Sequence, residues 1–446
     1  MILAALILAI SGLFVAYERL QKRANVVDLT VASGLANAQF FLIETSIAGI
    51  QFRIIMFFLG LIYILYRIST VKYKLRHVFG LNKLTLYWVM FSFTILFSKG
   101  LNGSYPLSVE TVTDFISRYG FALLCLWVFA LASVSSAVSI ARWLFLICLV
   151  NLTFAVLQLF GVGAAFDLQR SLYPVTVAYG DELIAQGLNS TFGYLPGLSP
   201  FSITTGYVFA VLAWLGVSFA AQPPKRFQTI GWTGLAVLIC AVGGSIILSR
   251  STVLAALFAL VVLFLLPLVL RERRTNRPGT IAIVLLGGVG FVLVQKIAES
   301  YVKGGERLMQ VGDEARYPIW EKSLSLILDH PFIGASDSVR YVVGLDIGAH
   351  NVLINALVQG GLITLTGLLT FLACAVRVSV ICVRRTHPTF RDLSAALFCA
   401  QMMYLLKSMF HNESVFTSGI LFMMIAGIII GIPYHMPLRL SKQRMR

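Results

Sequence analysis

Residues 251–270 read STVLAALFALVVLFLLPLVL, a run that carries no charged residue. A helix needs roughly 17–25 apolar residues to cross the hydrocarbon core of a bilayer, and this run is of that length. Similar runs recur along the chain, in which hydrophobic residues make up 58% and charged residues 12%. With a mean hydropathy of +0.86, the chain has too few charges to cover a water-facing surface. The composition therefore predicts a polytopic membrane protein.

The apolar segments predict an all-α fold, because only helices satisfy their own backbone polar groups inside a membrane. We expect about twelve spans in a single transmembrane domain, residues 1–446. The segment 27–50 carries Glu44 and is a thirteenth span, a re-entrant piece or an interfacial helix. Residues 2–17 lack a basic n-region and a clear cleavage site, so we expect a retained helix. The expected spans are 2–17, 52–67, 84–98, 119–138, 143–163, 203–221, 228–248, 251–270, 280–298, 355–383, 392–410 and 417–434.

The basic residues predict the orientation of these spans. They gather in the loops around 67–83, 225–226, 271–277 and 384–391 and in the tail, which all fall on one side if the spans alternate. The positive-inside rule makes that side cytoplasmic, so the net charge of +16 reflects orientation rather than nucleic-acid binding. The group Arg19, Lys22 and Arg23 would lie outside with twelve spans and inside with thirteen. The long polar loops 164–202 and 299–354 then face the opposite side, where we expect the chemistry.

Several classes of site are excluded by the motifs. The sequence has no P-loop, no G-x-G-x-x-G after a strand, no H-E-x-x-H and no G-x-S-x-G. All 6 cysteines lie within apolar segments and lack zinc-ligand spacing, so we interpret them as packing residues. We expect no metal and no cofactor.

Three short segments carry residues suited to chemistry at the outer surface. In Ser249-Arg250-Ser251-Thr252, an arginine lies at a helix start between hydroxyl groups, which suits a phosphate; the alternative is an arginine that extends to the interface. The stretch from Arg316 to Gly334 has apolar residues at helical spacing and predicts an amphipathic helix along the outer face. In His350-Asn351, the histidine can take a proton from a hydroxyl, or the pair can cap a helix.

Taken in order, these segments resemble the bacterial O-antigen ligase/polymerase superfamily of multi-span glycosyltransferases. The resemblance rests on Leu248-Ser249-Arg250, on Arg316, Trp320 and His330-Pro331-Phe332-Ile333-Gly334, and on His350-Asn351 followed by Gly360-Gly361. It covers roughly residues 240–365 and implies an enzyme of the bacterial inner membrane with its active site facing the periplasm. The implied donor is an undecaprenyl-diphosphate-linked glycan, and the implied acceptor is a glycan or lipid A–core. Membrane lipids and a chain-length regulator are further implied partners.

The resemblance also implies roles for residues in an inverting, metal-independent GT-C-type reaction. Arg250 and Arg316 would neutralise the diphosphate, and His350 would activate the acceptor hydroxyl. Arginine suits the first role because its planar fork pairs with phosphate oxygens and stays charged. Further candidates for substrate binding, each of which could instead be a solvated or capping residue, are Arg170, Arg307, Arg340, Tyr317 and Asn351, with Tyr173 and Asp346 as secondary candidates.

Members of this superfamily differ in the acceptor. The short distance in sequence between Arg316 and His350 favours a polymerase that joins repeat units, and the alternative is a ligase that transfers the glycan to lipid A–core. A flippase for lipid-linked oligosaccharides would also need many spans and basic residues. It would be expected to carry charges at mid-membrane, whereas the notable charges here gather at one face. A structural scaffold does not account for the long outer loops.

Overall fold

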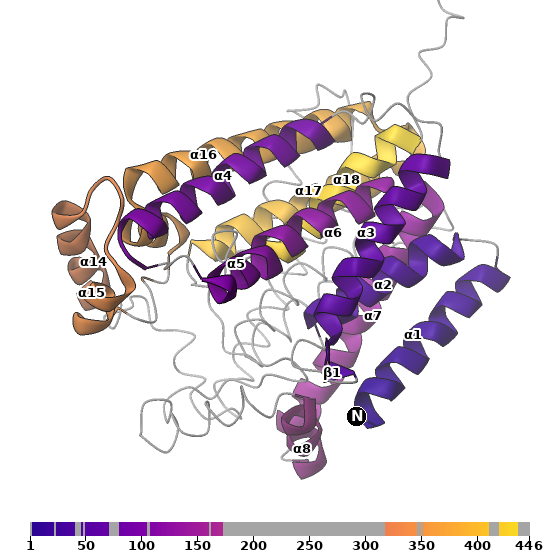
Figure 1. Cartoon of the computed structure of the whole chain (residues 1–446). Coiled ribbons are helices and arrows are strands. Elements are labelled where there is room, and N and C mark those ends of the chain that lie inside the picture. Colours follow the sequence, from indigo (N-terminus) through magenta and orange to yellow (C-terminus); the bar gives the residue numbers. More distant parts are fainter. Residues whose placement is uncertain are drawn as a thin grey trace, which may run out of the picture.

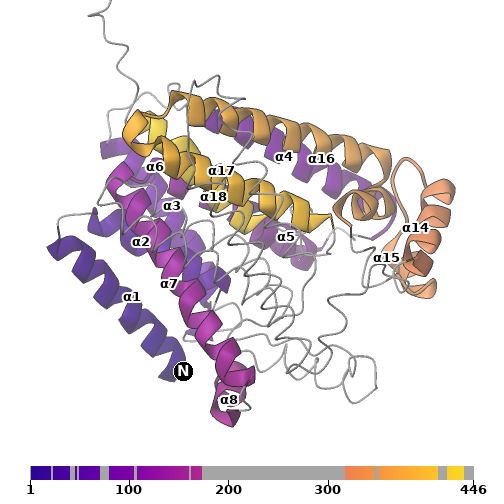
Figure 2. The same ribbon diagram turned by 180° about the vertical axis from the view of Figure 1, so that it is seen from behind.

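The computed structural model describes residues 2–21, 24–40, 46–47, 50–70, 80–104, 108–159, 162–172, 317–345, 349, 351–409 and 419–435. Within these ranges the chain is almost entirely helical, in agreement with the all-α prediction (Figures 1 and 2). Four of the described helices are long and apolar enough to cross a membrane. They cover Phe52–Thr70, Leu81–Leu101, Thr111–Leu131 and Val352–Arg385.

The elements fall into two groups along the chain. The first comprises α1 (Ile2–Leu20), α2 (Val26–Phe40), β1 (Ser46–Ile47), β2 (Ile50–Gln51), α3 (Phe52–Thr70), α4 (Leu81–Leu101), α5 (Val109–Phe115), the π-helical turn η2 (Ile116–Gly120), α6 (Phe121–Leu131), α7 (Val134–Leu159) and α8 (Gly163–Leu172). The second comprises α14 (Tyr317–Asp329), α15 (Asp337–Val342), α16 (Val352–Arg385), α17 (Pro388–Ser408) and α18 (Ile420–His435). The two strands form a short antiparallel hairpin between α2 and α3, with Ser46 opposite Gln51.

Helix α18 lies at the centre of the described bundle. Its side chains from Ile420 to Ile432 are buried, and it packs against α6, α16 and α17. Gly427 and Gly431 permit the contact with α6, because a Cβ atom at Gly427 would lie 2.6 Å from the Leu126 carbonyl oxygen. At Gly431 a Cβ atom would lie 2.8 Å from the Ala130 carbonyl oxygen. Small residues at this spacing let membrane helices approach closely.

Helices α4 and α16 run side by side along the bundle, as both views show. Their aromatic residues pack together. The ring centroids of Trp88 and Phe371 lie 5.0 Å apart, and the Phe91 ring stacks on that of Phe371 with a centroid distance of 5.9 Å. The Trp88 indole N–H donates to the Tyr119 carbonyl oxygen at 3.0 Å. Away from this contact, α4 exposes a stripe of apolar side chains at helical spacing, which suits a lipid-facing surface. These are Leu86, Met90, Phe93, Phe97 and Leu101.

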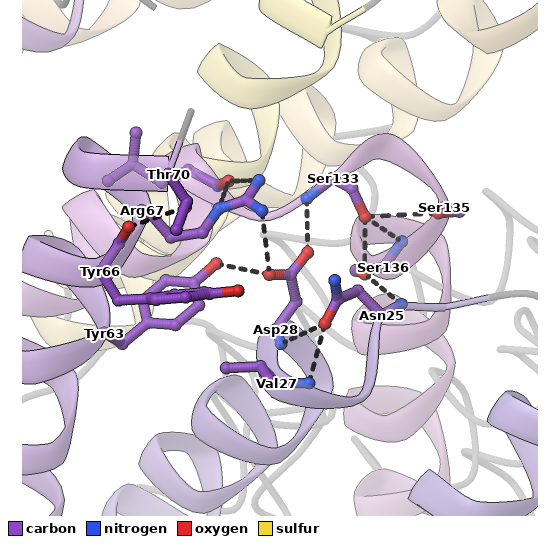
Figure 3. Close-up of polar contacts among 11 residues, drawn as sticks. Asn25, Val27, Asp28, Tyr63, Tyr66, Arg67, Thr70, Ser133, Ser135 and Ser136 are labelled. Carbon is purple, nitrogen blue, oxygen red and sulfur yellow. Dashed lines mark hydrogen bonds and ion pairs between the residues drawn. The ribbon is translucent and has the colours of Figure 1, made fainter. Parts of the chain in front are cut away.

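A buried carboxylate joins α2, α3 and the start of α7 (Figure 3). Asp28 accepts hydrogen bonds from the Tyr63 hydroxyl and from the Ser133 backbone N–H, both at 2.9 Å. Arg67 lies 3.7 Å from the same carboxylate and also donates to the Leu131 carbonyl oxygen at 2.7 Å. A buried charge is tolerated only when it is paired and hydrogen-bonded, as Asp28 is here.

This network shows which helix ends lie together. The start of α2, the end of α3 and the junction of α6 with α7 share one end of the bundle, called here the Arg67 end. The end of α1 belongs to it as well, because buried Glu18 accepts from the Ser139 hydroxyl at 2.6 Å and lies 3.4 Å from Arg142. Arg19, in the last turn of α1, is therefore at the same end as Arg67. That arrangement is the one that thirteen spans would give.

One sequence prediction for an individual span is wrong in its boundaries. The expected single span 119–138 is interrupted, because α6 ends at Leu131 and α7 begins at Val134. Ala132 is extended, and the next backbone N–H is bound by Asp28 instead of continuing the helix. For the segment 27–50, expected as a thirteenth span, a re-entrant piece or an interfacial helix, the structure has helix α2, which ends at Phe40, and then the hairpin.

Candidate functional site

The helix predicted after Arg316 exists as α14, and its first turn is joined to the segment before α16. The Trp320 indole N–H donates to the Ala349 carbonyl oxygen at 3.0 Å, and the Ala349 N–H donates to the Asn355 side-chain oxygen at 2.7 Å. The Trp320 and Tyr317 rings also pack edge to face, with their centroids 6.1 Å apart. These bonds bring together two segments that the sequence places about thirty residues apart. One begins directly after Arg316, and the other contains the residue directly before His350.

Asn351 fixes the start of α16. Its side-chain oxygen accepts from the backbone N–H groups of Leu353 at 2.9 Å and Ile354 at 3.1 Å, which is the geometry of a helix N-cap. Its amide nitrogen donates to the Met409 carbonyl oxygen at 3.0 Å, just beyond the end of α17. The capping role that the sequence left open for Asn351 is therefore present. Asn351 is therefore bonded both to the first turn of α16 and to the end of α17.

The loop 330–335 packs directly against a break in α16. Gly361 has φ +64° and ψ −164°, so the helix is interrupted there and the following N–H groups need other partners. The Leu362 N–H donates to the Pro331 carbonyl oxygen at 2.8 Å, and the Ala335 N–H donates to the Val358 carbonyl oxygen at 2.7 Å. A Cβ atom at Gly361 would collide with the backbone of Phe332. Glycine is required at this position by both conformation and space.

Asn102, at the end of α4, holds this junction from the bundle side. Its amide nitrogen lies 3.1 Å from the Ile333 carbonyl oxygen, 3.3 Å from that of Ala335 and 3.2 Å from that of Gln359. Its side-chain oxygen accepts from the Ser104 N–H at 3.1 Å. One amide therefore ties together α4, the loop after α14 and the last turn before the break in α16.

Charged side chains surround this same end of α4. Asp337 of α15 is bonded to Arg340, and the Asp337 backbone N–H donates to the Ser104 hydroxyl at 2.9 Å. Partial burial works to raise the pKa of the Asp337 carboxyl. The charges of Lys99 and Arg340 and hydrogen bonds from Arg340 and Ser104 outweigh that effect, so its pKa lies below the ordinary value. Arg340 is 6% exposed, and its Nε has no hydrogen-bond partner among the described residues.

The charged cluster extends from α15 across α4 to η2. Lys99 is within electrostatic range of Asp337, Arg340, Arg118 and Asp114, and Arg118 pairs with Asp114 at 2.8 Å. We call these five residues the α4–α15 cluster; its basic groups outnumber its acidic groups. Such a cluster attracts anions, because the surplus positive charge is partly removed from water.

One further arginine lies beside the cluster. Arg53, at the start of α3, places its guanidinium 4.8 Å from the centre of the Phe121 ring. Two of its buried nitrogens, Nε and one terminal nitrogen, have no hydrogen-bond partner among the described residues. Arg118 and Asp114 lie within its electrostatic range, which connects Arg53 to the cluster.

The structure does not bring all of the described candidates together. Tyr317, 62% exposed, and buried Arg340 both lie in the α14–α15 region. Arg170 lies on α8, where it is 4.0 Å from Asp167. Helix α8 follows α7 and packs against α1, well apart from α14 and α15 in both views (Figures 1 and 2). The remaining candidates lie outside the described residues: Arg250, Arg307, Arg316, His350, Tyr173 and Asp346.

Sequence reasoning missed Lys99, Asn102 and Arg53. Lys99 had a readable signal, because it ends an expected span on the side where the positive-inside rule makes lysine rare. Asn102 gave no such signal, since its role depends on carbonyl groups more than 230 positions later. Among the described residues, no group of three or more His, Cys, Asp or Glu side chains is placed to hold a metal ion.

Residues 235–369 match the model of the family described as O-Antigen ligase. The matched stretch contains the segments of Arg250, Arg316 and His350, helices α14 and α15, and the first half of α16. No curated protein matches the chain. The match confirms, over residues 235–369, the resemblance to the O-antigen ligase/polymerase superfamily drawn from the motifs: this multi-pass membrane protein carries an O-antigen ligase domain.

Proposed function

We propose that the protein transfers a glycan from a polyprenyl diphosphate to a sugar hydroxyl at the periplasmic face of the inner membrane. A membrane glycosyltransferase in the general sense is what the family match supports. The donor, the face and the acceptor are our inference. The observation that carries the proposal is the bond between Trp320 and Ala349, because it joins α14, which begins directly after Arg316 in sequence, to the residue directly before His350.

The charges around that junction support an anionic donor. The α4–α15 cluster lies where the loop after α14 meets α4, and Asn102 connects the two. Lys99 and Arg340 therefore add positive charge beside the loop that follows α14. In a water-poor site, fixed positive groups of this kind stabilise the negative charge that develops on a diphosphate leaving group. Arg250, from the same matched domain, would be the third contributor.

In the proposed reaction, the acceptor oxygen attacks the anomeric carbon of the donor sugar. The bond between that carbon and the diphosphate oxygen breaks, with inversion, and the electron pair leaves on the polyprenyl diphosphate. The hydroxyl proton passes to the His350 imidazole, as expected of a general base. Arg316 and Arg250 neutralise the leaving diphosphate, so no metal ion takes part. Trp320 and Asn351 position the two segments rather than touch the reacting atoms.

Two acceptors remain, and each has a supporting observation. The short interval between Arg316 and His350 favours a second lipid-linked repeat unit, which makes the enzyme a polymerase. The matched family, described as O-Antigen ligase, favours lipid A–core as the acceptor. Both reactions use the same bond-breaking step, so the acceptor alone separates them.

The test is transfer by the purified full chain in detergent, supplied with lipid-linked repeat unit, with and without lipid A–core. We expect release of undecaprenyl diphosphate together with longer lipid-linked glycans in the absence of lipid A–core. Growth of the product only when lipid A–core is present would identify a ligase. Absence of product in both mixtures from a folded protein would exclude glycan transfer and leave the flippase alternative, because detergent removes the second compartment.

Variants test the assigned residues. Arg316→Ala, Arg250→Ala and His350→Ala should each abolish transfer while the protein elutes as the wild type does. Arg19→Ala is the matched control, since Arg19 is exposed at the Arg67 end and far from the junction. Full activity of the His350→Ala protein would remove the general-base assignment.

A further inference from the structure

Helix α14 exposes two chemically different strips. Its protein-facing side includes buried Ser323 and Leu326. On the outer side, Tyr317, Leu324 and Leu328 recur at positions i, i+7 and i+11 and are 62%, 58% and 72% exposed. Phe332, just beyond the helix, is 66% exposed. We call these four residues the α14 apolar strip. A second exposed strip is polar and consists of Glu321, Lys322, Ser325 and Asp329, with Glu321 directly beside the apolar strip.

The apolar strip continues the lipid-facing surface of the bundle. The carbonyl oxygen of Phe332 accepts from the Ile363 N–H at 3.3 Å, so Phe332 lies beside the first turn of α16 after the break. Leu362 and Leu369, on that part of α16, are 45% and 47% exposed. Through Asn102, the same loop meets the end of α4, where Leu101 closes the exposed apolar stripe.

The length of α4 places this surface relative to a bilayer. Helix α4 has 21 residues and is therefore about 31 Å long, close to the thickness of the hydrocarbon core. Its two ends then lie near the two membrane boundaries. The α14 apolar strip, attached at the Leu101 end, is at the level of one boundary. With 13 residues, α14 is too short to cross, so it can meet lipid only along its side.

We propose that α14 lies in the membrane interface, with the α14 apolar strip inserted among the lipid acyl chains of the leaflet at the Leu101 end. The occupant is the bilayer itself, because the strip is continuous with the lipid-facing surfaces of α4 and α16. The polar strip then faces water, which is how an interfacial amphipathic helix is oriented. This placement follows from the geometry of α4, α14 and α16, and it stands whether or not the protein transfers glycans. It would hold the first turn of α14 at the depth of lipid headgroups.

The experiment is fluorescence quenching at matched positions of α14. Single cysteines replace Leu324, Leu328 or, as the control on the polar strip, Ser325 in a full-length chain whose native cysteines are substituted. Each is labelled with a small fluorophore and reconstituted into phosphatidylcholine vesicles without donor. We expect acyl-chain nitroxide lipids to quench the labels at 324 and 328 at least about twofold more than at 325. Aqueous iodide should show the opposite order.

Two results would overturn the proposal. One is equal quenching by iodide at all three positions, which places the strip in water. The other is protection of 324 and 328 from both quenchers, which means that a second copy or another protein covers the strip. If the cysteine-free chain does not fold, a genetically encoded photo-crosslinker at 324 or 325 of the otherwise wild-type chain gives the same decision. A lipid adduct at 324 and none at 325 is expected; a protein adduct at 324 contradicts the insertion.

Discussion

The side chain of Asn102 shows how one residue can set the geometry of a site without touching substrate. Its amide group has two hydrogens and lies within 3.5 Å of carbonyl oxygens from Ile333, Gly334, Ala335 and Gln359. Those carbonyls belong to the loop after α14 and to α16. The relative position of these two elements therefore depends on a donor supplied by α4.

Replacement of Asn102 should damage both stability and transfer. Asn102→Ala leaves partly buried carbonyl groups without a donor, which costs roughly 1–3 kcal/mol of folding free energy. Asn102→Asp keeps the acceptor for the Ser104 N–H but directs a carboxylate oxygen at the carbonyls, so it should be at least as harmful. Thermal unfolding in detergent and glycan transfer measure the two effects. If the Asn102→Asp variant has the same stability and activity as the wild type, the Asn102 amide does not hold α4, the loop after α14 and α16 together.

Asp337 makes stability depend on pH in a defined direction. Its pKa in the folded protein lies below the ordinary value, so the charged form is favoured by folding. The stabilisation is present above the ordinary carboxyl pKa of about 3.9 and is lost as the pH falls through the lower, folded pKa. Because the side chain is 48% exposed, solvent screening limits the contribution to less than about 1 kcal/mol.

Asp337→Asn should accordingly lower the melting temperature slightly at neutral pH and have a smaller effect near pH 3. Added salt should also reduce the difference, since the partners of the carboxylate are charged. Asp167→Asn is the control, because Asp167 is 76% exposed and lies 4.0 Å from Arg170. A difference between Asp337→Asn and wild type that grows as the pH falls would contradict the electrostatic assignment.

At the scale of elements, the break in α16 determines where the loop after α14 can bind. Gly361→Ala should be strongly destabilising for two independent reasons. Its φ of +64° is unfavourable for a residue with a side chain. In addition, the new methyl group would meet the backbone of Phe332, which cannot move away as a flexible side chain would. A melting-temperature decrease, accompanied by loss of transfer, is the expected result.

Gly367→Ala serves as the comparison on the same helix. A Cβ atom there would meet the Thr94 side chain, with its hydroxyl oxygen at 2.6 Å, and the threonine can rotate to make room. We expect a smaller decrease than for Gly361→Ala. Equal effects of the two substitutions would mean that the positive φ at Gly361 is unimportant.

Elements whose signal is local were predictable, and elements set by distant contacts were not. The apolar runs gave α3 and α4 to within a few residues, and the spacing of Ile319, Trp320 and Leu324 gave α14. The break after Leu131 could not be read from Ala132 and Ser133, because it depends on Asp28, which is 105 positions away from Ser133. The bond from Trp320 to Ala349 was equally hidden, since any residue offers a backbone carbonyl.

At the scale of the whole molecule, the ends of the helices decide between two topologies. The contacts of Glu18 with Ser139 and Arg142 place the end of α1 at the Arg67 end of the bundle. Helix α2 then returns to the other end, so that α1 and α3 run in the same direction. In this arrangement the basic residues at the end of α1 join those after α3 on one side. For these two groups of basic residues the positive-inside rule is obeyed.

Sidedness of labelling separates this topology from one with twelve spans. Exposed Gln21 and Ser69 lie at the Arg67 end, whereas exposed Ser338 lies on α15, which contacts the opposite end of α4. Cysteines placed at 21 and 69 should react with a membrane-impermeant maleimide from the same side of sealed vesicles, and a cysteine at 338 from the other. With twelve spans, and no crossing by residues 26–40, position 21 would instead react from the side of 338. The pair 69 and 338 is the internal control, because both topologies place them on opposite sides, and agreement of 21 with 338 would therefore contradict the helix packing described for α1 and α2.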